Sequence, residues 1–198
     1  FNVLAPKIKP KLVIFLNIFR DQLDRYGEID TVLKKWALTV AKLPLSTHYL
    51  VNGSDPSLAP LTKQLKGKIT LFGINNQIIQ AEKKHFTGAS PKLDIAADQL
   101  KLDGLSGSGF DVHFQSTVAN AKTRINLPLP GKYHIYDFLA AFAASLWLKI
   151  PITTVKEALL NYSPAFGRVE KIDLSGQNNK IKEAYIFLIK NPYGASQV

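Results

Sequence analysis

The chain has 198 residues, enough for one sizeable domain or one and a half; 46% are hydrophobic, 20% are charged, and the formal net charge is +10. The absence of cysteine excludes disulfides, zinc–thiolate sites and cysteine nucleophiles, and no segment reaches the roughly 18 uninterrupted apolar residues that a membrane span needs. The excess of lysine and arginine favours an anionic partner such as nucleic acid, a nucleotide, a phosphorylated substrate or an acidic membrane, and a solubilising surface explains it equally well.

The first part of the chain predicts alternating strands and helices. Strands are predicted at residues 11–17, 47–56 and 67–74. The first of them, "KLVIFLN", is continuously apolar, as strands of a parallel sheet covered by helices are. Apolar residues at three- and four-residue steps predict a helix over 29–43, and Asp55 or Ser57 is expected to cap a short helix ending near Leu65. This order is typical of a doubly wound α/β sheet.

The remaining chain changes character. Alternation and Gly/Ser turns over 97–117 and 122–130 predict an antiparallel hairpin and a third strand, in which Gly104, Gly107 and Gly109 act as turn glycines. Two helices are predicted next, over 133–150 and 151–166. Two strands and the start of a loop follow from Gly167 onward, so the domain boundary is expected there.

A polar cluster follows the first strand. In open α/β sheets ligands bind beyond the carboxyl ends of the strands, so these residues are candidates for a site. Aspartates are the oxygen ligands that Mg²⁺ takes, and arginines bind phosphate or carboxylate oxygens through two nitrogens. A solvated, salt-bridged helix start explains the same composition. The cluster consists of Asn17, Arg20, Asp21, Gln22, Asp24 and Arg25.

A second candidate is the start of the helix in "LPGKYHIYDFLAA". Tyr133, His134 and Asp137 lie at or near its N-terminus, where a nucleotide base or a phosphate can be held. Ordinary helix capping is the alternative. Lys190, after the last apolar strand, suggests a phosphate contact or a plain strand end, and the four histidines have no metal-ligand spacing.

In their order, these motifs resemble the Mur ligase superfamily, and most closely its MurT branch, the synthetase subunits of lipid II isoglutaminyl synthase. The resemblance rests on four stretches, "LNIFRDQLDRYGEID", "LPGKYHIYDFLAA", "FGRVEKI" and "LIKNPYGASQV". It implies a Mur-ligase central domain over 1–167, with a mostly parallel sheet flanked by helices and a small antiparallel sheet. Residues 168–198 would form the first strands of a C-terminal α/β domain.

The resemblance also implies a reaction. Such enzymes use ATP and Mg²⁺ to activate the D-glutamate α-carboxyl of lipid II as an acyl phosphate, and ammonia from a GatD-like glutaminase subunit converts it to D-isoglutamine. Arg20, Asp21, Gln22, Asp24 and Arg25 then match the catalytic motif, with Asp21 and Asp24 as metal ligands. The matches on the nucleotide side are Asn17, Tyr133, His134, Asp137, Arg168 and Lys190.

Several departures qualify the resemblance. Leu16 replaces the usual Thr, and His134 and Asp137 stand where the branch has Asn, which places adenine binding in question. The P-loop segment, most of the C-terminal domain and the four-cysteine zinc ribbon are absent from the sequence. We therefore expect a fragment that is inactive alone, because no residue in it can cradle a triphosphate.

Two alternatives remain from the sequence. One is another Mur-superfamily ligase that adds an amino acid in place of ammonia. The other is a non-catalytic basic α/β module that binds nucleic acid or acidic membrane. The MurT reading implies no nucleic-acid partner and no transmembrane segment. It implies a cytoplasmic location, at the inner face of the cell membrane where lipid II is reached.

Overall fold

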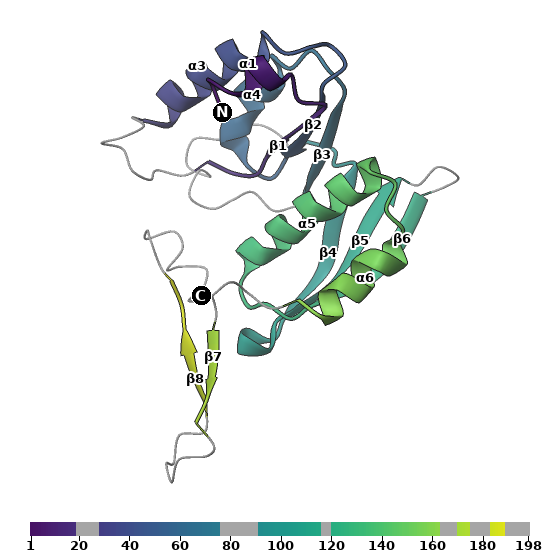
Figure 1. The fold of residues 1–198 in the computed structure, drawn as a ribbon. Coiled ribbons are helices and arrows are strands. Elements are labelled where there is room, and N and C mark those ends of the chain that lie inside the picture. The colour runs from purple at the N-terminus through teal and green to yellow at the C-terminus, as the bar shows by residue number, and fades with distance from the viewer. Residues whose placement is uncertain (19–27, 76–90, 116–119, 163–169, 175–182, 189–198) are drawn as a thin grey trace.

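The computed structural model describes residues 1–18, 28–75, 91–115, 120–162, 170–174 and 183–188. Six strands form one sheet in sequence order: β1 Leu12–Phe15, β2 His48–Asn52, β3 Ile69–Ile74, β4 Ile95–Leu102, β5 Ser108–Gln115 and β6 Asn120–Leu127. The first four strands pair in parallel, and β5 and β6 pair antiparallel (Figure 1). The predicted α/β class and its mostly parallel sheet are therefore confirmed.

Helices cover both faces of this sheet. They are α1 Ala5–Ile8, α3 Ile29–Val40, α4 Ala59–Thr62, α5 Lys132–Trp147 and α6 Ile152–Leu160, with one-turn 3-10 segments η1 Pro56–Leu58 and η3 Gly104–Ser106. The predicted strands and helices are all present, with ends shifted by a few residues. The hairpin predicted near residue 100 extends the main sheet, because β4 pairs in parallel with β3 as well as antiparallel with β5.

A separate two-stranded sheet pairs β7 Glu170–Asp173 with β8 Glu183–Ile186. It matches the two strands predicted near the end of the chain, beyond the central domain predicted over 1–167. The expected boundary at Gly167 falls on residues 163–169, outside the described residues. In the described part of the chain, none of the helices has the length and hydropathy of a membrane span.

The sheet separates two apolar clusters. On one face α5 packs over β2, β3 and β4, where Phe110 meets Phe138 and Phe114 meets Phe142 edge to face, with ring centroids 5.6 and 5.2 Å apart. On the other face α1, α3 and α4 pack over β1 and β2. Successive strand residues face opposite sides, so a strand between two helical layers must be apolar throughout.

Strand β2 shows this requirement in full. Tyr49, Leu50 and Val51 are each 1% exposed, and they alternate between the two clusters. Strand β1 differs, because α5 packs over β2 to β4 and Ile14 remains 40% exposed. Leu12 still packs against the α5-side cluster, so β1 is covered less completely on that face than β2 is.

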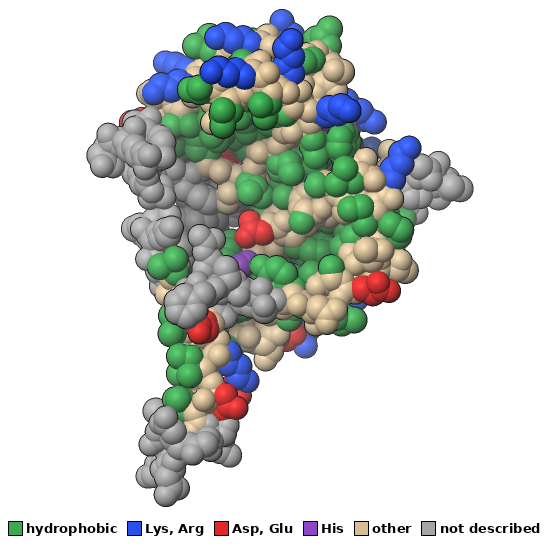
Figure 2. Space-filling view, viewed as in Figure 1, with side chains coloured by type: hydrophobic (Ala, Val, Ile, Leu, Met, Phe, Trp, Pro, Cys, Tyr) green, Lys and Arg blue, Asp and Glu red, His purple; other side chains and the backbone are tan. Residues whose placement is uncertain are grey.

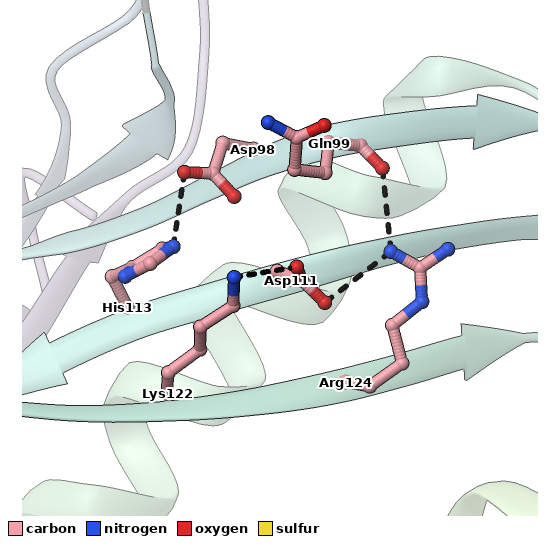
Figure 3. Close-up of polar contacts among 6 residues, drawn as sticks. All are labelled: Asp98, Gln99, Asp111, His113, Lys122 and Arg124. Atoms are coloured by element: carbon pink, nitrogen blue, oxygen red, sulfur yellow. Dashed lines mark hydrogen bonds and ion pairs between the residues drawn. The ribbon is translucent and has the colours of Figure 1, made fainter.

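The outer face of β4, β5 and β6 is polar (Figure 3). Lys122 Nζ lies 2.8 Å from Asp111 Oδ2, and Arg124 Nη1 lies 3.3 Å from Asp111 Oδ1. The hydrogen bond from Lys122 holds the pKa of Asp111 below its usual value. Arg124 also donates to the carbonyl of Gln99, which has φ +49 at a register shift in β4. These pairs stabilise the bulged strand with locally balanced charge.

The turn between β4 and β5 gives a direct test of the backbone. Gly104 has φ +58 with no atom within 4 Å of an added Cβ, whereas Gly107 has φ +112 and its Cβ would lie 2.2 Å from the Leu127 carbonyl oxygen. We predict that Gly104→Ala lowers the free energy of unfolding by about 1 kcal/mol through backbone strain alone. Gly107→Ala should lower it by about 3 kcal/mol or more, because strain and overlap combine.

Urea titration of the two variants beside the parent chain checks this difference. Gly104→Ala is the matched control, since both positions belong to one turn. Equal losses in the two variants would contradict the close approach of Gly107 to the end of β6.

Candidate functional site

Chain direction brings the candidate residues to one edge of the sheet. Strands β1 to β4 are parallel, and β6 runs in the same direction because both β4 and β6 are antiparallel to β5. Helix α5 begins five residues after β6 ends, so its N-terminus starts at the edge where β1 to β4 finish. The polar turn after β2 lies at that edge too. We call the edge of the sheet at which β1 to β4 and β6 end the carboxyl edge. Ligands of open α/β sheets bind at this edge.

Asp55 connects the end of β1 to the turn after β2. Its Oδ2 accepts the backbone N–H of Ile18 at 2.8 Å, and its Oδ1 accepts the N–H of Ser57 at 2.9 Å. Asp55 is 2% exposed. A buried carboxylate is stable only when hydrogen-bonded, so these two amides stabilise the charge while the charge fixes where the chain leaves β1.

Ser54 makes the corresponding connection to β3. Its hydroxyl accepts the N–H of Ile74 at 3.0 Å and donates to the carbonyl of Ile74 at 3.3 Å. A Cβ at Gly73 would lie 2.4 Å from Ser54 Oγ, so the close approach requires glycine there. The ends of β1, β2 and β3 are thus held together by one turn.

Asn52 completes this turn at the end of β2. Its Oδ1 accepts the N–H of Ser54 at 3.0 Å, and the residue is fully buried. Its Nδ2 has no hydrogen-bond partner among the residues that the structure describes. The amide is a donor at the carboxyl edge, close in the chain to the residues that anchor β1 and β3.

From the sequence, this "NGSD" segment is predicted as the end of the strand over 47–56, with Asp55 as a possible helix cap. Asp55 does cap η1, as that reading allowed. Its bond to Ile18 spans 37 residues and has no local pattern, so only the fold shows it. The sequence did contain one indication of a site here: a run of polar residues directly after an apolar strand, as at Asn17.

The N-terminus of α5 carries the second predicted set. Gly131 is its N-cap, with φ +91 and no side chain to cap the helix. The Tyr133 and His134 rings lie 4.0 Å apart, and His134 Nδ1 is 3.6 Å from Asp137 Oδ2. His134 Nε2 is buried and has no hydrogen-bond partner in the described structure. The set offers backbone donors, an aromatic ring and an imidazole nitrogen.

Of the other predicted site residues, the structure describes only Asn17. Asn17 is half-buried, directly before the anchored Ile18. In the described segments no three His, Cys, Asp or Glu side chains form a group that could hold a metal. The Mg²⁺ assignment to Asp21 and Asp24 therefore stays a prediction. The predicted residues outside the described structure are Arg20, Asp21, Gln22, Asp24, Arg25, Arg168 and Lys190.

A cavity of about 360 Å³ lies farther along the carboxyl edge. Its lining includes residues of the β4–β5 turn, the end of β6 and the end of α6, among them Asp103, Ser106, Asn126 and Leu160. Ser108 Oγ, also in the lining, is buried without a hydrogen-bond partner among the described residues. From the sequence this segment is predicted only as a Gly/Ser turn, because the other residues that line the cavity belong to β6 and α6 and to the loop after β6.

A mostly parallel sheet between helices, with polar turns and the N-terminus of α5 at its carboxyl edge, defines an α/β domain of the open-sheet class, whose members bind ligands at that edge. The family comparison is more specific: the Mur ligase middle domain model matches residues 3–145. The chain belongs to this family.

Curated relatives include two kinds of Mur ligase. The UDP-N-acetylmuramate–L-alanine ligase of Clostridium novyi is 26% identical over 83% of this chain and 31% of its own length. The lipid II isoglutaminyl synthase subunit MurT of Streptococcus pneumoniae is 28% identical over 96% of this chain and 46% of its own length. The chain thus spans about a third to a half of these relatives.

The solved structures agree on the fold. A pseudomurein peptide ligase type C from Methanothermus fervidus superposes with a TM-score of 0.71 at 18% identity. The superposition covers 98% of this chain and 41% of the other. The family match confirms the expected Mur ligase superfamily. The alanine ligase and the MurT subunit are both Mur ligases, so the match does not distinguish between them.

Replacement of Asp55 tests the connection between β1 and the turn. Asp55→Asn keeps the shape and one acceptor oxygen, but it places an amide N–H against one of two backbone donors. We expect the free energy of unfolding to fall by about 1–3 kcal/mol, the cost of an unsatisfied buried donor. Asp103→Asn is the control: Asp103 pairs at the surface with Lys101, and its loss should change stability by less than about 1 kcal/mol. Equal urea midpoints for both variants would contradict the role of Asp55.

Proposed function

We propose that this chain is part of an ATP-dependent amide ligase that amidates the α-carboxyl of D-glutamate in lipid II, giving D-isoglutamine. Members of the Mur ligase family are ATP-dependent amide or peptide ligases. The observation that carries the MurT assignment is the extent of the match. The MurT relative aligns over 96% of the chain, against 83% for the alanine ligase.

The reaction defines what the carboxyl edge must bind. ATP transfers a phosphoryl group to the carboxylate, ammonia attacks the acyl phosphate, and the products are the amide, ADP and phosphate. Positive charge and metal must therefore meet the phosphates and the carboxylate in one place. We assign Arg20 and Arg25 to these oxygens and Asp21 and Asp24 to Mg²⁺. Gln22 completes the motif.

The described residues next to this motif support the assignment. The anchor of Ile18 on Asp55 fixes the point where the chain leaves β1, two residues before Arg20. Asn17 is placed on the nucleotide side of the same loop. The N-terminus of α5, with Tyr133, His134 and Asp137, begins at the same edge and is assigned to the nucleotide base. Arg168 and Lys190 are assigned to the phosphates from the C-terminal side.

The proposal extends to organisation and partners. We place the central domain at 1–167 and the start of the C-terminal domain at 168–198. A GatD-like glutaminase subunit supplies ammonia, and the reaction takes place on the cytoplasmic side, at the membrane surface that carries lipid II. A second candidate, a Mur ligase that joins an amino acid to a carboxylate, is favoured by the alanine ligases among the relatives.

The first experiment measures the product. The complete reading frame, expressed with any adjacent glutaminase, receives Mg-ATP, an ammonium salt and lipid II, and the stem peptide is followed by mass spectrometry. We expect an amide in place of a carboxylic acid. Arg20→Ala and Asp21→Ala should each lower the rate by about 100-fold or more, because each removes transition-state charge stabilisation. Asp30→Ala, on the exposed side of α3, is the matched control.

The nucleophile separates the two candidates. Amidation that depends on ammonium or glutamine supports the proposal. ATP cleavage that depends on an added amino acid, with that residue joined to the product, would assign the chain to the second candidate. Unchanged rates in both site variants would overturn the residue assignment.

His134 and Asp137 test the base site. Asparagine both donates and accepts hydrogen bonds, whereas an ionised aspartate only accepts. We predict that His134→Asn with Asp137→Asn tightens ATP binding to the complete protein by about fivefold, the effect of about one added hydrogen bond. Lys149→Asn, beyond the far end of α5, is the control. Calorimetric titration with an unchanged Kd for ATP would remove these residues from the base site.

A further inference from the structure

Charge is divided unevenly between the two parts of the structure. The described residues of the β1–β3 part, 1–18 and 28–75, contain nine lysines and three acidic residues. Those of the β4–α6 part, 91–115 and 120–162, contain seven basic and six acidic residues. The net charge of +10 therefore does not spread evenly. All nine lysines of the first part are exposed: Lys7, Lys9, Lys11, Lys34, Lys35, Lys42, Lys63, Lys66 and Lys68.

Neighbouring acids do not neutralise these lysines. Within the described ranges, none of the nine forms an ion pair, whereas Lys101, Lys122 and Arg124 of the second part all pair with aspartates. The positive charge also affects His48. Burial is the main cause that lowers the pKa of His48, and the nearby charge of Lys68 lowers this pKa further. The first part of the structure thus presents uncompensated positive charge.

Exposed apolar side chains lie on α1 and α3 and in the residues next to them. Leu4, Ile8, Leu38 and Leu45 are 62% to 71% exposed. The N-terminal segment lies against α3, since Thr39 Oγ1 donates to Asn2 Oδ1 at 2.9 Å. Figure 2 shows lysine and hydrophobic side chains interleaved at the top of the molecule, where Figure 1 places α1 and α3. We call this surface the lysine face: Lys7, Lys34, Lys35 and Lys42 with Leu4, Ile8, Leu38 and Leu45.

We propose that the lysine face docks the protein on an anionic phospholipid bilayer. Lysines beside anionic lipid gain electrostatic attraction, and exposed aliphatic side chains between them enter the interface between headgroups and acyl chains. Both components are present on one surface. The proposal rests on the proposed function only in that a lipid-linked substrate would be met at such a membrane.

Two other occupants fit the surface less well. Base recognition uses arginine forks and stacking aromatics, and the eight residues of the lysine face include neither. The strongly exposed apolar residues of the face are aliphatic, which suits acyl chains better than bases. A second copy of the chain would bring the unpaired lysines of both copies together, and like charges repel.

The test is a flotation assay with the 198-residue chain. The vesicles are pure phosphatidylcholine, or phosphatidylcholine with about a quarter phosphatidylglycerol, a fraction chosen to give a negative surface potential. We expect binding to the anionic vesicles only. Lys34→Glu with Lys35→Glu should weaken it by about tenfold or more. Lys92→Glu with Lys156→Glu makes the same charge change on exposed residues of the second part, and should have a much smaller effect.

A second pair of variants separates docking from charge alone. Ile8→Ser with Leu38→Ser keeps every charge and replaces exposed side chains, so folding should not change. We expect these variants to lose the binding that persists at about 1 M salt, where the Debye length falls to about 3 Å. Equal binding to neutral vesicles, or equal loss in both lysine pairs, would overturn the proposal. Preference for an oligonucleotide over anionic vesicles at equal ionic strength would overturn it too.

Because flotation requires no turnover, it fails independently of the ligase proposal. Amidation without vesicle binding would leave the function and remove the docking surface. Vesicle binding without amidation would leave the surface and remove the function.

Discussion

The shared direction of β1, β2, β3, β4 and β6 is the constraint on which the rest of the molecule depends. Parallel pairing requires each strand to return by a crossover; the described crossover helices α3 and α4 cover one face of the sheet, and α5, which follows β6, covers the other. All five strands then end at one edge, where the turn after β2 and the start of α5 both lie. The candidate residues are 120 positions apart in the chain, and this topology alone brings Asn17 and Asp137 to the same edge.

Local patterns predicted the elements well, because burial on one or both faces determines their sequences. The apolar run of β2 and the spacing from Ile29 to Val40 are examples. Pairings between distant segments were not predictable. The bond from Asp55 to Ile18, the fit of Ser54 against Gly73 and the parallel pairing of β4 with β3 leave no local signal. Similarly, Tyr133 and His134 could be placed at a helix start, but only the fold shows that His134 Nε2 is buried with no hydrogen-bond partner among the described residues.

The two parts of the structure treat charge differently. On the β4–β6 face, acids and bases pair across strands, and the resulting network supports a bulge. On the α1–α3 surface, the described lysines form no ion pair, and exposed aliphatic residues lie beside them. A paired network stabilises its own sheet, whereas exposed lysines without ion pairs leave a positive potential that attracts an anionic partner. This contrast is the physical basis for assigning structure to one face and contact with a partner to the other.

The hydrogen bonds between Ser54 and Ile74 join the turn after β2 to the end of β3. This connection combines neutral hydrogen bonds with a steric fit against Gly73, and neither depends on ionic strength. The nearby carboxylate of Asp55 is buried, where salt screens it little. The lysine face behaves differently, because salt screens the electrostatic attraction between its exposed lysines and anionic lipid within about a Debye length. A change of ionic strength can therefore weaken the attachment of the protein to a membrane while the geometry of its carboxyl edge stays the same. Location and chemistry are then separately adjustable in one small domain.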